Sequence, residues 1–128
     1  MNVTRFDEAP EYRPPNHFGM RCVRLQGHEA GFSETLWMGA SIIEPGGRVE
    51  QSSSPVEKHY VVIEGEIVLD NGQETVTLGL FDSCRLAPGE PRAIRNVAAT
   101  RAILLLAMPF ADKPVPPPPV SSRHSTTS

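Results

Sequence analysis

The sequence predicts an all-β protein folded as a single jelly roll or small β-barrel. Short runs rich in β-branched and aromatic residues recur along most of the chain, which suits pleated, half-buried strands. Glycine, proline and asparagine turn signals separate these runs. No stretch shows the apolar period of an amphipathic helix of three turns. Many short strands at close spacing, joined by such turns, are typical of a barrel or jelly roll.

The expected strands follow one another from residue 21 onward. Apolar and polar residues alternate over the first strand, and the longer second strand ends at the turn signal Pro45-Gly46-Gly47. Asn71-Gly72, between two later strands, indicates a β-hairpin with a type I′ turn. Pro88-Gly89 marks another turn. The predicted strands cover residues 21–26, 34–44, 59–63, 66–70, 74–78, 83–86, 92–96 and 100–108.

The two ends differ in composition from the middle of the chain. Residues 1–18 place several prolines among charged residues without any periodicity, so we predict an irregular arm that crosses the surface or reaches a partner subunit. Residues 113–128 are rich in Pro, Ser and Thr and cannot bury enough apolar area to offset the entropy of ordering. They are predicted to form a disordered tail, with a polyproline ligand for another protein as the alternative. Residues 19–112 then form the barrel domain.

Length and charge limit the classes of function. The 128 residues are enough for one domain, and the net charge of −3 argues against nucleic acid, which needs a basic face. The N-terminus lacks an apolar signal region, and no apolar run approaches the roughly 18 residues of a membrane span. We therefore expect a cytoplasmic protein that binds no membrane. Cys22 and Cys84 match no metal-ligand spacing and are predicted to be buried thiols rather than a disulfide.

Two segments carry a recognisable pattern of glycine, proline and charged residues. The first joins Pro45-Gly46-Gly47 to the polar run Gln51-Ser52-Ser53-Ser54 and to residues 57–66, Glu-Lys-His-Tyr-Val-Val-Ile-Glu-Gly-Glu. The second is residues 81–96, from Phe81 through Pro88-Gly89 to Asn96. Together they resemble the two motifs of the cupin superfamily, in particular its small single-domain, RmlC-like members. The resemblance implies a conical β-barrel, and we predict a homodimer.

The same resemblance bears on cofactors. Cupins usually bind a metal through His-x-His and Glu in the first motif and a third His in the second. In this chain residues 51–54 fill the His-x-His region, Lys58 stands where the Glu belongs, and Arg92 stands where the last His belongs. Lysine and arginine repel a divalent cation, and Gln and Ser oxygens are weak ligands. We therefore expect no metal and no other cofactor. The four histidines, His17, His28, His59 and His124, have no spacing suited to a metal site elsewhere.

The resemblance also points Lys58 and Arg92 into the barrel. Because side chains alternate along a strand, Tyr60 and Glu64 should share the side of Lys58, and His59 should face outward. In the polar run either Gln51 and Ser53 or Ser52 and Ser54 face inward. We take the first pair, Gln51 and Ser53, as candidate ligand-binding residues. The expected opposite wall comprises Trp37, Met38, Arg85 and Tyr60.

Two cations that face a cavity need a counter-ion, because burial of unpaired charge is costly. There are two alternatives. In the first, the cations are paired internally, Lys58 with Glu64 and Arg92 with Glu57, Glu90 or Asp82. In the second, the site is open for an anion. The open site predicts a metal-independent enzyme of isomerase, lyase, cyclase or hydrolase type that acts on a small organic anion such as a carboxylate. The candidate catalytic residues are Lys58, Tyr60 and Glu64. The candidate ligand-binding residues are Gln51, Ser53, Arg92, Trp37 and Arg85.

The alternatives come from other classes of function. In the first alternative, the chain is a non-catalytic module that binds a small ligand or only dimerises. In the second, it is a metal-dependent cupin dioxygenase or decarboxylase. In the sharpest form of the enzyme hypothesis, Lys58 is an amine nucleophile that forms a Schiff base.

Overall fold

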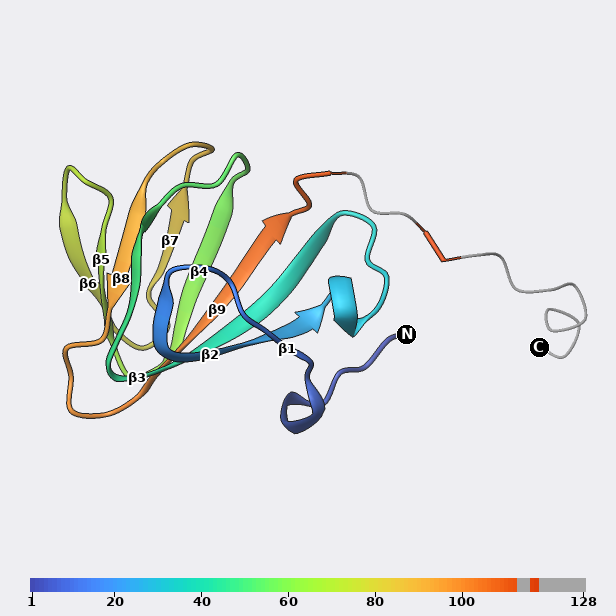
Figure 1. Ribbon diagram of the computed structural model, residues 1–128, viewed down its shortest axis with the longest axis horizontal. Coiled ribbons are helices and arrows are strands. Elements are labelled where there is room, and N and C mark those ends of the chain that lie inside the picture. Colours follow the sequence, from blue (N-terminus) through green and yellow to red (C-terminus); the bar gives the residue numbers. More distant parts are fainter. Residues whose placement is uncertain (113–115, 118–128) are drawn as a thin grey trace, which may run out of the picture.

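The computed structural model describes residues 1–112 and 116–117, and it confirms the all-β prediction. Its strands form one nearly closed barrel in which all pairings are antiparallel (Figure 1). The predicted tail, residues 113–128, lies outside the described residues except at positions 116–117. The elements are η1 (Phe6–Glu8), β1 (Glu11–Tyr12), β2 (His17–Gln26), η2 (His28–Ala30), β3 (Leu36–Ser52), β4 (Lys58–Glu64), β5 (Ile67–Asp70), β6 (Thr75–Leu78), β7 (Ser83–Leu86), β8 (Arg92–Arg95) and β9 (Ala102–Pro109).

Strand β3 builds two walls of the barrel. Its first half pairs with β9 and its last residues pair with β8, so the strand order is β6-β5-β8-β3-β9-β4-β7. The prediction that this strand ends at Pro45-Gly46-Gly47 was wrong, because the segment bends the strand without ending it (Figure 1). Gly47 permits the bend, since a Cβ there would lie 2.4 Å from the carbonyl oxygen of Gly19.

The end of the barrel at this bend is closed by apolar packing and by Asn96. Ile43, Ile67, Ala102 and Leu104 are almost fully buried there and in the adjoining core. The Asn96 side chain donates to the carbonyl oxygens of Ile43, at 3.0 Å, and Thr100, at 2.9 Å. This end of the barrel is therefore filled by packed side chains.

The hairpin predicted at Asn71-Gly72 is present between β5 and β6. Its turn type was predicted wrongly. The Asn71 amide donates to Glu74 O, which centres the turn on Gly72 and Gln73, and of these only Gly72 has a positive φ. A type I′ turn needs a positive φ at both central residues. The Asn71 side chain instead accepts hydrogen bonds from the Gln73 and Glu74 amides.

The N-terminal arm folds back onto its own barrel. Residues 11–12 form β1 against β2, and the Arg24 amide donates to Pro10 O at 2.8 Å. The sheet therefore begins at Glu11 and β2 begins at His17, both before the expected boundary at residue 19. Across residues 1–112 and 116–117, the structure contains no helix with the length and apolar character that a membrane crossing requires.

Candidate functional site

A cavity of about 430 Å³ lies at the end of the barrel opposite Asn96. Strand ends build it, because Lys58 is the first residue of β4, Arg92 is the first residue of β8, and Trp37 is near the start of β3. Arm residues Tyr12 to Pro15 form part of its rim. The lining residues are Tyr12, Arg13, Pro14, Pro15, His17, Arg24, Trp37, Ser54, Lys58, Arg92, Leu106 and Met108.

The cavity is strongly cationic. It is lined by Lys58 and three arginines, and none of the described lining residues is Asp or Glu. Of these cations Arg24 is paired, at 2.9 Å, with Glu29, which is not among the described lining residues. Lys58 is 9% exposed and Arg92 is 6% exposed. Burial in this position, together with the nearby Arg92 guanidinium, lowers the pKa of Lys58 from its ordinary 10.5 to about 8.

Arg92 is held from behind by two neutral side chains. Its Nε donates to Tyr60 Oη at 3.1 Å, and its Nη1 donates to Ser52 Oγ at 2.6 Å. Tyr60 is 4% exposed and does not line the cavity, so it positions Arg92 and does not face a ligand. Burial raises the pKa of Tyr60, which therefore stays neutral. The guanidinium keeps its positive charge and has further N–H donors for a ligand.

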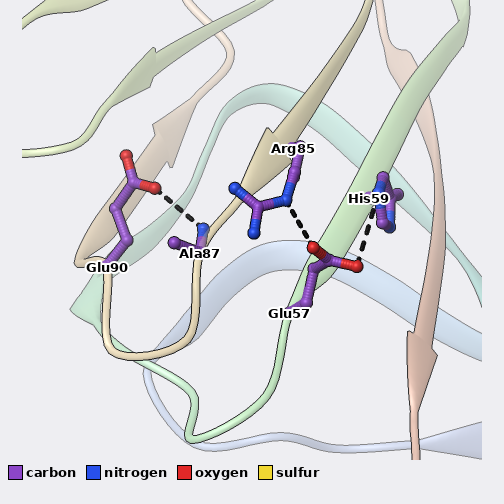
Figure 2. Close-up of polar contacts among 5 residues, drawn as sticks. All are labelled: Glu57, His59, Arg85, Ala87 and Glu90. Atoms are coloured by element: carbon purple, nitrogen blue, oxygen red, sulfur yellow. Dashed lines mark hydrogen bonds and ion pairs between the residues drawn. The ribbon is translucent and has the colours of Figure 1, made fainter.

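The carboxylates that the internal-pairing alternative assigned to Arg92 contact other groups. Figure 2 shows Glu57 turned toward Arg85 and His59, and Glu90 turned onto the Ala87 amide, which lies 2.8 Å from the Glu90 oxygen. Asp82 accepts a hydrogen bond from the Gly79 amide. Internal pairing of Lys58 or Arg92 with an acidic residue is not found within residues 1–112.

Glu64 lies outside the cavity, contrary to its expected inward orientation. It accepts a hydrogen bond from Arg101 at 2.7 Å, and both side chains are about half exposed. The cause is a register shift in β4, where Val62 pairs with Leu104 but Glu64 pairs with Ile103. The extra residue reverses the alternation of side chains beyond Val62.

A second register shift displaces the polar run. Val49 of β3 pairs with Ile94, whereas Ser52 pairs with Arg92, so β3 has one more residue than β8 in this interval. Ser52 and Ser54 therefore turn toward the cavity, and the candidates Gln51 and Ser53 are exposed. Gln51 lines a different surface hollow beside Asn71 and Glu90.

Two further candidates have opposite outcomes. Trp37 lines the cavity as expected, but Arg85 is 56% exposed and pairs with Glu57 on the outer face of the barrel (Figure 2). The partner of Trp37 on the cavity wall is Met108 and not the expected Met38. The Arg24 guanidinium lies 3.5 Å from the Tyr12 ring centroid and 4.4 Å from that of Trp37, which fixes both rings at the rim.

Sequence reasoning missed His17. Its Nδ1 lies 2.7 Å from Pro15 O, and because a carbonyl can only accept, Nδ1 carries the proton and Nε2 has the free lone pair. Burial lowers the pKa of His17, and this effect outweighs the hydrogen bond to Pro15 O, which raises it; the charges of Arg92 and Lys58 lower the pKa further. A neutral imidazole with Nε2 available lines the cavity. No spacing in the sequence connects residue 17 with residues 58 and 92, so only the fold brings them together.

The two cysteines are free thiols, as predicted, but only Cys22 is buried, and Cys84 is half-buried. The donor set at the positions of the usual cupin metal ligands does not suit a metal. Those positions hold Lys58, Arg92 and residues 51–54, Gln-Ser-Ser-Ser, and His17 supplies the single imidazole among the described lining residues. No cluster of three His, Cys, Asp or Glu side chains suited to a metal ion occurs within the described part of the chain.

A second hollow, of about 460 Å³, is a weaker candidate. It is lined mainly by His28, Phe32 and Phe110 and contains Asp112 as its one described carboxylate. It gathers no set of acid, base and anion-binding groups, so we place the functional site in the cationic cavity.

Comparisons with known proteins agree with this architecture. The chain is 44% identical over 109 residues, 84% of its length, to the Mycobacterium tuberculosis protein named beta-D-galactosidase Rv1717, and covers 93% of that protein. Its fold is similar to the polyketide cyclase RemF of Streptomyces resistomycificus, with a TM-score of 0.77 and 17% identity over 95% of this chain and 88% of that chain. It is also similar to a predicted oxalate decarboxylase of Thermotoga maritima, with a TM-score of 0.72 and 23% identity over 86% of this chain and 99% of that chain. Residues 40–108 match the model of the cupin domain, and the chain therefore belongs to the cupin family.

Proposed function

We propose that the protein binds a small organic anion, such as a carboxylate, in the cationic cavity and transfers a proton on it without a metal. The observation that carries the proposal is the burial of Lys58 and Arg92 in a cavity whose described lining contains no carboxylate. Unpaired buried cations are costly, and an anionic ligand would offset that cost. The reaction classes that suit this arrangement are isomerisation, elimination, cyclisation and hydrolysis.

Arg92 is the anchor of the proposed ligand. Because Tyr60 and Ser52 already fix its guanidinium, little entropy remains to be lost when a carboxylate binds. A guanidinium presents parallel N–H donors that match the two oxygens of a carboxylate. Lys58 adds a compact charge that would stabilise negative charge developing on the bound molecule.

His17 is the proposed general base. The hydrogen bond to Pro15 O leaves Nε2 as the nitrogen that can accept a proton. The lowered pKa keeps the imidazole neutral at pH 7. A base beside two cations suits removal of a proton from carbon next to a carbonyl or carboxyl group, since the cations stabilise the resulting anion.

A thermal-shift screen of dicarboxylates, keto acids, hydroxy acids and aromatic acids tests the proposal, followed by titration of variants. Arg92→Ala should weaken binding by roughly thirtyfold to a thousandfold, which corresponds to about 2–4 kcal/mol. Arg85→Ala is the matched control, because that arginine pairs on the outer face, and it should bind normally. The proposal is wrong if no anion stabilises the wild-type protein, or if the hits stabilise Arg92→Ala equally well.

Hydrolysis of a β-galactoside is a second candidate function, favoured by the name of the 44% identical relative. Glycosidases usually use a pair of carboxyl groups that flank the scissile bond. The described cavity lining offers none, so His17 and Lys58 would have to replace them. A chromogenic β-galactoside assay with wild type, His17→Gln and Lys58→Met decides between the two functions. If wild type hydrolyses the substrate and the two variants do not, β-galactoside hydrolysis replaces the anion proposal.

A further inference from the structure

The Lys58 side chain is largely buried, and its amine reaches the cavity without a protein partner among the described residues. It lines the cavity, is 9% exposed, and makes no hydrogen bond or ion pair within residues 1–112 and 116–117. Arginine supplies ten of the twelve cationic side chains, and Lys58 and Lys113 are the chain's two lysines. This matters chemically, because a buried lysine can lose its proton and become a nucleophile, whereas arginine stays charged.

The groups around Lys58 favour the neutral amine. Arg92 faces it from β8, His17 from β2, and Arg13 and Arg24 lie on the same cavity lining. These groups are cationic or neutral, so none of them stabilises an ammonium ion. Burial is the main cause of the lowered pKa of Lys58, about 8, and Arg92 adds to it. About a tenth of the amine is then neutral at pH 7, far more than for an ordinary lysine.

We propose that Lys58 Nζ forms an imine with the carbonyl carbon of a small oxo acid whose carboxylate is bound by Arg92. This rests on the proposed function, because Arg92 must hold the acid, and it adds the substrate class and a covalent step. A cavity of about 430 Å³ accommodates an acid of a few carbon atoms.

The chemistry is balanced without an oxidant or reductant. The lone pair of neutral Nζ forms a bond to the carbonyl carbon, and the carbonyl π electrons move to oxygen. Proton transfer from nitrogen to oxygen gives a carbinolamine, and loss of water, which carries both amine hydrogens and the carbonyl oxygen, gives the imine. His17 Nε2, which has a free lone pair, is placed in the same cavity to accept the proton from nitrogen and return it to the departing hydroxyl.

Reductive trapping tests the inference on the full chain. The protein is incubated with pyruvate and cyanoborohydride at pH 7, and the modified residue is located by peptide mass spectrometry. Since the amines are Lys58, Lys113 and the N-terminus, assignment is direct. Lys58 should be labelled at least about tenfold faster than Lys113, because its neutral fraction is much larger than that of a lysine with the ordinary pKa of 10.5. Acetone, which has the same carbonyl without a carboxylate, should label Lys58 more slowly than pyruvate.

Two variants separate the covalent step from anion binding. Lys58→Arg keeps the charge and removes the nucleophile, so pyruvate should still raise its melting temperature but leave no adduct at residue 58. Arg92→Met keeps the amine and should lose the preference for pyruvate over acetone. If pyruvate stabilises wild type without labelling Lys58 preferentially, the imine is refuted and the anion site stands. If it neither stabilises nor labels the protein, both proposals fail. If Lys58→Arg does not fold, the comparison of pyruvate with acetone on the wild-type protein tests the inference instead, and equal labelling of Lys58 by both would overturn it.

Discussion

Replacement of Lys58 by methionine is expected to stabilise the protein at neutral pH. The fall of the Lys58 pKa from 10.5 to about 8 means that folding makes the ammonium form less favourable. At about 1.4 kcal/mol per pKa unit the penalty is on the order of 3 kcal/mol. Solvent at the open side of the cavity reduces it to about 1–2 kcal/mol. Methionine has a similar shape without the charge, so Lys58→Met should unfold at a temperature higher by roughly 4–8 °C.

The stability difference between Lys58→Met and wild type should depend on pH. Below pH 8 the lysine is charged in both the folded and the unfolded chain, so the full penalty is present. Between pH 8 and about 10.5 the folded chain has lost this proton while the unfolded chain retains it, so wild-type stability rises relative to the variant. The advantage of Lys58→Met should therefore be largest at pH 7 and shrink toward pH 10.

The assay is thermal unfolding followed by circular dichroism at pH 7 and pH 9.5, in buffers free of carboxylates that would occupy the cavity. Arg101→Met is the matched control. It removes an exposed cation that pairs with Glu64, and it should leave the melting temperature nearly unchanged. A Lys58→Met protein that is less stable than wild type at pH 7, or whose stability difference does not change with pH, would refute the unpaired-ammonium argument.

Four other outcomes are expected. Gly47→Ala should destabilise the fold by about 2 kcal/mol or more, since the new Cβ would lie 2.4 Å from the Gly19 oxygen. Chemical denaturation measures the free energy of unfolding, and an unchanged value would contradict the close approach. Asn96→Leu should cost about 2–4 kcal/mol, because buried carbonyls lose their donor; a change below 1 kcal/mol would count against this. Glu64→Gln should leave ligand affinity unchanged and stability within about 1 kcal/mol, because its partner Arg101 is exposed; titration checks the affinity. Sedimentation at micromolar concentration should show a homodimer, and a monomer would refute that prediction.

The local signals that define strands were readable in the sequence. β-branched runs and turn residues located the ends of most predicted strands to within four residues, and the segment 83–86 coincides with β7. The exception is the end of β3, which was predicted at residue 44 and lies at Ser52. Such signals depend on neighbouring residues, so they survive without tertiary information. The resemblance to the cupin motifs also predicted that Lys58 and Arg92 point into the barrel, with Trp37 on the opposite wall, and all three line the cavity.

Tertiary structure alone decided the side-chain set of the cavity. One extra residue in β3 exchanged Gln51 and Ser53 for Ser52 and Ser54, and one in β4 turned Glu64 out to solvent. Alternation is a local rule, whereas a bulge arises from pairing with a strand that is distant in sequence.

His17 illustrates the same division. Its residue type gives no sign of a role, and its place beside Lys58 and Arg92 depends on β2 pairing with β3 and on the arm that supplies the Pro15 carbonyl. The sequence by itself determined an all-β cupin barrel with two cations at former metal-ligand positions. Only the fold decided that these cations lack carboxylate partners within the described residues and share their cavity with a neutral imidazole, because charge pairing and proton affinity depend on which groups meet in space.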